Sequence, residues 1–559
     1  MTPFRPSRPA FAVLAVLAGC GDGSAPGGAS LTCDEVAPTT LAPGHLALGD
    51  ASETACVRLA EAGPDGAEYL YMAYSAAPEE SQNGTYASYL LTAEGEDSPP
   101  AVRSPRLADI SSPTTPATRL HDRLRVLGRD LARRSAGARL DRPRPPALVV
   151  PPVPGQQRTF KVLRSATASG THEDDFVEVE GTARYVGSRV AIFLDDAAPT
   201  EGGYTPDDLA AIGSLFDDHL HPIDVDAFGA ETDINADGRV LVLLTDRVTR
   251  LAGCGNGQVV VGLFFAVDLF PDLVGSNDAE IFYGLTPDAS CGVDREDAIG
   301  LLPSVFIHEF QHMINYGQKV IVRDGDAEDI WLDEGLSGFA EELGGRLVPA
   351  DRCLDGDCVT QFHSGNLVNA YAYLRALDNA YLIGPRRPPL PLTQYGATWL
   401  FVRWLADHFA ADPTLGTDLT RAMVETTRTG AANVAAATDT PFARLIGEWQ
   451  LANYLADRGD LAAVTSGTRF GYTSWNLPAV FAAFSEDDPA RFPRAYPLEP
   501  ARFSGAEYVQ SGLLRAGSGH HLLVELPAGS TVDLRLTEPG GTSPISSDAE
   551  PHTALLRLR

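Results

Sequence analysis

The segment that most constrains the fold of this chain runs from Val305 to Tyr316 and reads Val-Phe-Ile-His-Glu-Phe-Gln-His-Met-Ile-Asn-Tyr. Residues four apart lie on one face of an α-helix, so the imidazoles of His308 and His312 can both reach a single metal ion. Glu309 lies beside them and can take a proton from a water molecule at that metal. Histidine is scarce, with 12 residues in 559, so we do not attribute this spacing to chance. The flanking residues are mostly apolar, which predicts a buried helix in which unpaired histidine and glutamate would be costly.

A catalytic zinc site needs a third protein ligand, and the residues after His312 restrict where it lies. One known extension of the motif places a glycine three residues after His312 and a histidine six after it, but this chain has Asn315 and Gln318 there. Residues 329–343 predict a second helix, in which apolar residues surround several carboxylates. The candidates for the third ligand in this helix are Glu334, Glu341 and Glu342.

The combination of H-E-x-x-H with the later string W-L-D-E-G resembles the gluzincin zinc peptidases, the clan of thermolysin and the zinc aminopeptidases. The glutamate ligand of that clan lies in a W-L-N-E-G-like helix, so the resemblance implies Glu334 as the third zinc ligand. The longer string H-E-F-Q-H-M-I-N is most similar to the hyicolysin-like branch of secreted bacterial peptidases. Asp333 stands where relatives commonly have asparagine, and its carboxylate can still accept the free N–H of a ligand histidine.

The resemblance also implies a residue that stabilises the oxyanion. Tyr395 opens a predicted long helix and is similar in position to the oxyanion tyrosine of the aminopeptidase relatives. The alternative is a core tyrosine whose hydroxyl bonds to the backbone. Tyr316, His363 and His408 are weaker candidates, and a structural role is favoured for each of them.

The resemblance implies a zinc-dependent metalloendopeptidase in which Glu309 activates a zinc-bound water against a peptide bond. An aminopeptidase-like exopeptidase is less favoured, because no G-A-M-E-N-like segment is present and Gly275–Glu280 is not a match. A non-catalytic surface binding or adhesion protein on a zincin-like core is the alternative from another class. Retention of both histidines together with Glu309 and Glu334 argues against that alternative.

We expect an α+β fold in which residues 158–470 form a zincin-like catalytic domain. Strand-like runs predict a mixed sheet within 158–300, and the helical spacing of apolar residues predicts a helical part within 301–470 that contains the H-E-x-x-H helix. Short apolar runs between turn residues predict a small β-sandwich-like domain on each side, at 33–100 and 471–559.

Residues 101–157 are rich in proline, serine and arginine, so we expect a linker with one helix at Arg119–Arg134. Its arginines leave open a processing site, and with it a zymogen from which residues 33–157 are removed. A solvated basic segment is the alternative, and it is the more favoured of the two.

Residues 1–19 have the form of a signal peptide, because two arginines precede the apolar run Ala10–Leu17, which is too short to span a bilayer. The run ends in Leu-Ala-Gly-Cys, which resembles the bacterial lipoprotein signal and implies cleavage before Cys20 and lipidation of this cysteine. Residues 20–32 are rich in glycine and predict a flexible tether. We therefore expect an extracytoplasmic lipoprotein, anchored by its lipid at the outer membrane or cell surface.

Six cysteines remain after Cys20, and an extracytoplasmic location permits disulfides. Pairing each cysteine with its nearest neighbour in the sequence predicts three bonds, namely Cys33–Cys56, Cys254–Cys291 and Cys353–Cys358.

The charge of the chain narrows the choice of partner. It carries 74 acidic and 43 basic residues, a net charge of −31, which argues against nucleic acid because phosphate binding draws on clustered lysine and arginine. We expect a protein or peptide substrate, with membrane contact only through the lipid.

Residues 233–239 read Asp-Ile-Asn-Ala-Asp-Gly-Arg and resemble the start of a calcium loop, with Asp233, Asn235 and Asp237 as candidate Ca²⁺ ligands. The twelfth position of that loop is Leu244, where an EF-hand needs glutamate. We therefore favour a turn that caps a strand at Val240.

Overall fold

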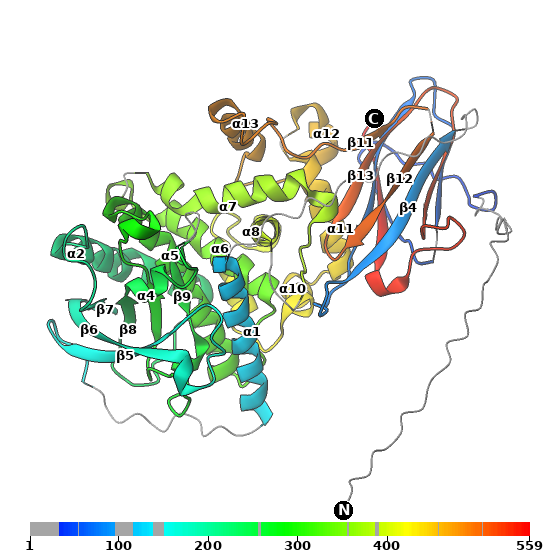
Figure 1. Cartoon of the computed structure of the whole chain (residues 1–559). Helices are drawn as coiled ribbons and strands as arrows, with labels where there is room; N and C mark the ends of the chain where they lie inside the picture. The colour runs from blue at the N-terminus through cyan, green and yellow to red at the C-terminus, as the bar shows by residue number, and fades with distance from the viewer. Residues whose placement is uncertain are drawn as a thin grey trace, which may run out of the picture.

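In the computed structural model, the described residues are 33–53, 55–95, 116–137, 150–254, 259–354, 357–385, 391–456, 458–505 and 507–559. The expected signal peptide, Cys20 and the tether lie outside them. A β-sandwich formed from both ends of the chain lies beside a larger unit of sheet and helices (Figure 1). The chain is thus α+β, as its sequence predicts.

Strands from the two ends of the chain are interleaved within the sandwich. One sheet has the order β1-β15-β3-β13-β11 and the other β12-β4-β14-β2. Each of two early strands, β3 and β4, lies between two late ones. The bounds are β1 Leu46–Asp50, β2 Cys56–Leu59, β3 Ala67–Ser75, β4 Tyr86–Gly95, β11 Ala501–Phe503, β12 Tyr508–Arg515, β13 Gly519–Leu526, β14 Val532–Thr537 and β15 Pro551–Arg557.

The two segments that we expected to be separate β domains, 33–100 and 471–559, are therefore parts of one sandwich. Residues before the first late strand add a helix, α13 (Leu477–Asp487), rather than strands. Alternating apolar residues identify a strand, but its partner is chosen by side-chain packing between segments that are distant in the sequence. The sequence pattern therefore could not reveal the pairing.

The larger unit contains a six-stranded mixed sheet of order β5-β6-β7-β8-β10-β9. β7, β8 and β10 are parallel, and β9 pairs antiparallel with β10 at one edge. Along β8, Val240 and Val242 pack into one core and Leu241 and Leu243 into another, as a strand buried on both faces requires. The bounds are β5 Gln157–Leu163, β6 Phe176–Val186, β7 Val190–Asp195, β8 Val240–Leu244, β9 Gly262–Phe264 and β10 Ile281–Gly284.

Most of the helices pack in the core that contains Val240 and Val242, on one face of this sheet, whereas Val248 packs in the core on the other face. α5 begins at its N-cap Asp294, whose side chain accepts the N–H of Asp297. α6 and α8 approach closely at Gly335, where a Cβ would lie only 2.9 Å from the carbonyl oxygen of Thr398. The bounds are α2 Pro206–Leu215, α3 His221–Phe228, α4 Asp246–Thr249, α5 Arg295–Tyr316, α6 Ile330–Leu347, α7 Cys358–Arg375, α8 Leu392–Phe409, α9 Thr417–Val424, α10 Gly430–Thr438, α11 Phe442–Leu455 and α12 Ala462–Thr465.

One further helix, α1 (Pro116–Gly137), lies in the segment that we expected to be a linker. It includes the whole of the expected helix Arg119–Arg134. Leu120 and Leu124 are buried in the same core as Leu263 of β9, so α1 is packed into the larger unit rather than joining two units. In Figure 1 it crosses this unit close to α6 and β9.

The six cysteines form the three disulfides that their order predicts: Cys33–Cys56, Cys254–Cys291 and Cys353–Cys358. In the part of the chain that the structure describes, no helix is both long enough and apolar enough to cross a bilayer.

Two buried histidines of β13 make the stability of the fold sensitive to acid. Burial lowers the pKa of His520 and of His521 to about 4, whereas an unfolded histidine titrates near 6.5. The unfolded chain therefore binds more protons below pH 6.5, and stability is lost as the pH falls from 6.5 towards 4. We expect each histidine to contribute about 3 kcal/mol to this loss.

Urea unfolding of the metal-free protein at pH 7 and pH 4.5 measures the effect, with His521→Gln as the comparison. The glutamine amide can still donate to the carbonyl of Gln450, which His521 contacts at 2.9 Å, but it does not titrate. The variant should lose less stability between the two pH values. An equal loss in both proteins would show that His521 is not buried in its neutral form.

Candidate metal and catalytic site

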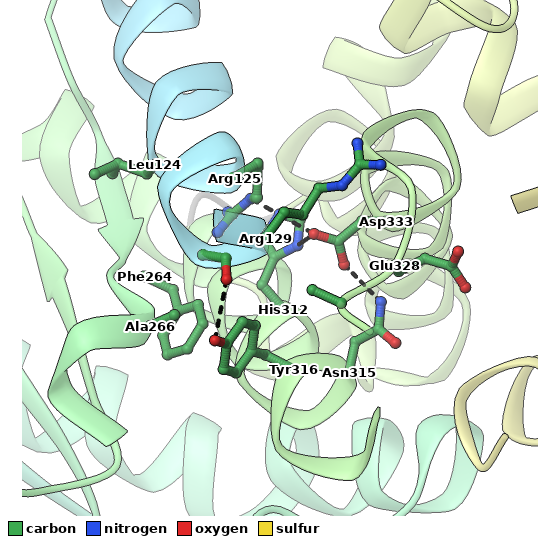
Figure 2. Close-up of a pocket in the computed structure, with 12 residues that line it drawn as sticks. Leu124, Arg125, Arg129, Phe264, Ala266, His312, Asn315, Tyr316, Glu328 and Asp333 are labelled. Carbon is green, nitrogen blue, oxygen red and sulfur yellow. Dashed lines mark hydrogen bonds and ion pairs between the residues drawn. The ribbon is translucent and has the colours of Figure 1, made fainter. Parts of the chain in front are cut away.

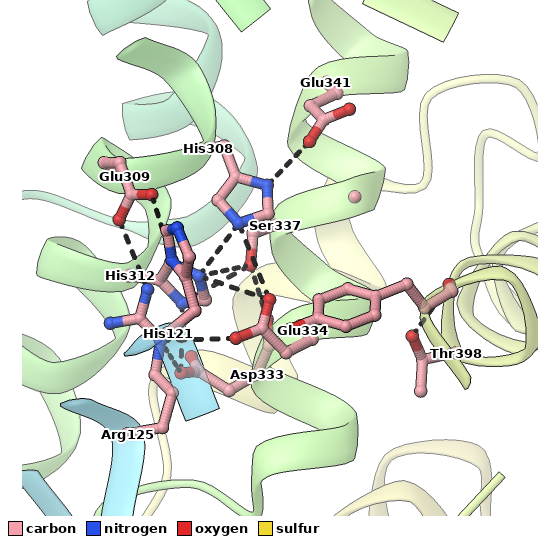
Figure 3. A network of polar contacts seen from close by, with 12 residues as sticks. His121, Arg125, His308, Glu309, His312, Asp333, Glu334, Ser337, Glu341 and Thr398 are labelled. Atoms are coloured by element: carbon pink, nitrogen blue, oxygen red, sulfur yellow. Dashed lines mark hydrogen bonds and ion pairs between the residues drawn. The ribbon is translucent and has the colours of Figure 1, made fainter. Parts of the chain in front are cut away.

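Two helices bring a pair of imidazoles and a carboxylate together. The Nε2 atoms of His308 and His312 on α5 are 3.1 Å apart, and Oε2 of Glu334 on α6 lies 3.5 Å and 3.7 Å from them. These atoms all lie within 4.8 Å of one another (Figure 3). The polar face of α5 points toward α6 because its other faces bury apolar residues completely, namely Phe306, Ile307, Phe310, Met313 and Ile314.

The other ring nitrogen of each histidine faces a carboxylate. Nδ1 of His312 lies 3.0 Å from Oδ2 of Asp333, the contact expected for this aspartate. Nδ1 of His308 lies 2.6 Å from Oε1 of Glu341, on the opposite side of the ring from Glu334 (Figure 3). When the Nδ1 atoms carry the protons, the two Nε2 lone pairs face each other, and a cation shared between them relieves their repulsion.

This donor set suits a metal ion. Two imidazole nitrogens and one carboxylate oxygen are the ligands of many catalytic zinc sites. Burial by itself would lower the pKa of His308, but Glu334 and Glu341 outweigh it and hold that pKa well above its usual value. The surrounding carboxylates thus strongly favour positive charge at this point.

The other two candidates for the third ligand have different partners. Glu341 is engaged by His308 and by the side-chain amide of Asn366, 3.0 Å away. Glu342 is fully buried in a separate cluster, where it accepts hydrogen bonds from Arg403 at 3.1 Å and from the indole of Trp399 at 3.0 Å. Glu334 is therefore the carboxylate that the structure places against both imidazoles.

Glu309 lies next to this group and is held by two donors. Its Oε2 accepts the backbone N–H of Phe264, at the end of β9, at 2.7 Å and a guanidinium N–H of Arg125 at 3.2 Å. Burial alone would raise the pKa of Glu309, but Arg125 and His121 outweigh burial and the pKa is lowered. Glu309 is thus held in its ionised form.

The residues that sequence reasoning missed come from α1. Arg125 is 7% exposed, and its Nε lies 3.3 Å from Glu334 and 3.7 Å from Asp333. His121 Nδ1 lies 3.8 Å from Glu309. One feature of the sequence could have indicated that α1 is packed against the rest of the protein. Leucines recur on one face of this helix, at positions 120, 124, 127 and 131.

A small cavity separates α1 from α5 and α6 (Figure 2). Its volume is about 20 Å³, which is room for about one water molecule. Twelve residues line it: Leu124, Arg125, Gly128, Arg129, Phe264, Ala266, His312, Asn315, Tyr316, Ala327, Glu328 and Asp333. Four of these residues come from α1, so α1 forms one wall of the cavity beside His312.

The structure places Tyr395 at the edge of the site, on α8. Its hydroxyl donates to Oδ1 of Asp122 on α1 at 3.3 Å. The weaker candidates all bond to backbone carbonyl oxygens: Tyr316 to Gly128, His363 to Glu342 and His408 to Gly471. Those three contacts are the structural roles favoured for them.

The segment that resembles a calcium loop forms a turn before β8. Oδ1 of Asp233 accepts the N–H of Gly238 at 3.2 Å, and Oδ1 of Asp237 accepts the N–H of Arg239 at 2.8 Å. Oδ1 of Asn235 accepts the N–H of Asp237 at 3.1 Å. These hydrogen bonds are those of the strand-capping turn that the sequence favours.

Among the described residues, Cys254, Asp288 and Cys291 also lie close enough together to form a metal-binding group. The two cysteines form a disulfide, so their sulfurs do not offer thiolates to a metal.

Sequence comparisons agree with the class of site that this geometry defines. Over 184 residues the chain is 29% identical to the neutral metalloprotease ShpI of Staphylococcus hyicus, and this stretch covers 32% of the chain and 40% of the relative. The chain thus matches less than half the length of that curated relative. No protein-family model matches the chain. The partial homology and the His308, His312 and Glu334 group together support a metallopeptidase.

Proposed function

We propose that this chain is a zinc-dependent metalloendopeptidase of the gluzincin type, most similar to the hyicolysin-like branch. The observation that carries the proposal is the convergence of His308, His312 and Glu334 on one point, with Glu309 beside them. The similarity to a neutral metalloprotease supports the same class of reaction.

Each side chain of the site has its own role in the proposed reaction. A zinc ion in this donor set would lower the pKa of a water molecule and polarise a peptide carbonyl. Glu309 would accept the proton of the attacking water and return it to the leaving amine. Asp333 and Glu341 hold the Nδ1 protons of the two histidines and so orient both rings. The hydroxyl of Tyr395 is the candidate donor to the oxyanion.

Substrate and location belong to the same proposal. The substrate would be an extracytoplasmic protein or peptide, and a lipid on Cys20 would hold the protein at a membrane. The three disulfides suit an oxidising compartment outside the cytoplasm. The rival proposals are a non-catalytic binding lipoprotein and an aminopeptidase-like exopeptidase.

Replacing Glu309 with glutamine tests the proposal, because the amide keeps the shape of the side chain but cannot accept the proton. We expect Glu309→Gln to keep about one zinc per chain and to lose casein cleavage by about 100- to 10,000-fold. Glu296→Gln is the matched control, since Glu296 is exposed at the start of the same helix. Metal analysis and digestion of casein and a peptide library provide the readouts. Zinc binding without cleavage by any form of the protein would favour the binding lipoprotein.

A further inference from the structure

We propose that α1 is an internal inhibitory segment, in which Arg125 occupies the position between Glu309 and Glu334 where substrate must enter, and that cleavage requires α1 to leave. The inference rests on the proposed function. It goes beyond that function by assigning the intact chain a latent state and naming the residue that maintains it.

The first observation is the placement of the Arg125 guanidinium. It lies within hydrogen-bonding distance of Glu309, at 3.2 Å, and of Glu334, at 3.3 Å. A peptide carbonyl attacked by water activated by Glu309 must lie close to both of these residues. The guanidinium therefore occupies the reaction space itself.

The second observation is the lack of room beside α1. The cavity between α1 and the helices α5 and α6 has a volume of about 20 Å³, enough for about one water molecule. An extended peptide needs about 3.3 Å of length for each residue, with side chains on both sides of its backbone. The cavity between α1 and these two helices is therefore too small for a peptide while α1 is in place.

The third observation is that α1 is held firmly along its length. Its leucines are buried in the core on one face of the sheet. Arg129, one turn after Arg125, pairs with Glu80 and also with Asp329 at 2.8 Å. The hydroxyl of Tyr316 donates to the carbonyl of Gly128 at 3.1 Å. Several contacts in addition to those of Arg125 therefore hold α1 over the site.

The charge of Arg125 supplies a readout that does not depend on catalysis. A guanidinium beside Glu334 and Asp333 competes with a divalent cation for the same negative charge. Removing that charge while keeping the length of the side chain should therefore strengthen zinc binding. Arg125→Met makes this change, because methionine retains much of the apolar stem of arginine.

The experiment compares the full chain with Arg125→Met and with Arg133→Met. Arg133 is a control on the same helix, because its side chain is 54% exposed and pairs only with Asp130 among the contacts that the structure gives it. We expect Arg125→Met to bind zinc about 10-fold or more tightly in competition with a chelator. We also expect it to cleave casein about 10-fold or more faster than wild type. Arg133→Met should match wild type in both measurements.

A disulfide lock in the Arg125→Met protein tests separately whether α1 must move. A Cβ at Gly128 would lie 3.5 Å from Cβ of Ala266, within the range of about 3.5–4.5 Å that disulfides require. Gly128→Cys with Ala266→Cys in the Arg125→Met background should cross-link on oxidation and lose the gained cleavage. Gly128→Cys without Ala266→Cys, in the same Arg125→Met background and oxidised in the same way, should keep the gained cleavage.

The outcomes separate this inference from the proposed function. Tighter zinc binding by Arg125→Met without cleavage by any form would support the inhibitory contact and overturn the peptidase. Another outcome is that wild type cleaves casein at a rate that neither Arg125→Met nor the lock changes, with the same zinc affinity as Arg125→Met. That result would overturn the inhibitory role of α1 and leave the proposed peptidase function intact. Full activity of the cross-linked protein would by itself refute the displacement of α1.

Discussion

Glu334→Ala is expected to weaken zinc binding by more than about 100-fold, and casein cleavage should disappear with the metal. The reason is the position of its Oε2 atom, 3.5 Å and 3.7 Å from the Nε2 atoms of the two histidines. Changes to residues that only orient ligands cost about 10- to 100-fold in metal affinity, and removing a ligand should cost more. The affinity is best measured by chelator competition in the Arg125→Met background, so that no guanidinium is left beside the altered site.

Glu341→Gln is the matched control for this prediction. Glu341 lies two turns after Glu334 on the same helix and contacts His308 through Nδ1 rather than Nε2. We expect a loss of zinc affinity of about 10- to 100-fold, because the ring would lose the carboxylate that orients it. A larger loss in Glu341→Gln than in Glu334→Ala would reassign the third ligand to Glu341.

Glu342→Ala is expected to lower the free energy of unfolding by about 3–5 kcal/mol while leaving zinc affinity unchanged. The carboxylate and the Arg403 side chain are both fully buried, 3.1 Å apart. The indole N–H groups of Trp399 and Trp475 also donate to this carboxylate, at 3.0 Å and 2.8 Å. Alanine would leave a buried cation and two donors without this acceptor. Urea unfolding measures the loss.

The pair substitution Glu342→Met with Arg403→Met serves as its control. Removing both charges together leaves no guanidinium without Glu342, but it also takes Arg403 from the buried Asp407, 3.2 Å away, so only part of the lost stability should return. If Glu342→Ala were as stable as wild type, the carboxylate would contribute nothing net to this cluster. If it lost zinc instead, Glu342 would have to be reconsidered as a ligand.

Local regularities of the sequence were sufficient to predict that His308 and His312 share one helix face, whereas the choice of Glu334 over Glu341 and Glu342 came from the family resemblance. Helical spacing puts both imidazoles on one face of α5, and the buried apolar residues around them orient that face toward α6. Asp333 and Glu334 are neighbours on α6, so the helix itself directs one toward the Nδ1 atom of His312 and the other toward the Nε2 atoms. The disulfides followed from sequence order.

Arg125 could not be found in this way. No periodicity connects α1 to α5, since their contact depends on a fold in which residues more than 180 apart in the chain meet. The composition of the surrounding segment pointed to a linker, although the leucine spacing within it indicated a packing face. The pairing of β3 with β13 could not be predicted for the same reason. The alternation of apolar and polar residues predicts two strands but does not say which strands pair.

The interleaved sandwich has a consequence for any backbone cut that would free α1. Loss of residues 33–157 would remove the central strands β3 and β4 from their two sheets, so a zymogen of that kind would dismantle the sandwich. Cuts on both sides of α1 would instead leave a two-chain molecule joined by the ladders of β3 with β13 and of β4 with β12. The N-terminal chain, with any lipid on Cys20, would then stay bound to the catalytic chain without a peptide bond between them. If Cys20 carries a lipid, activation of this kind would leave the protein at the membrane.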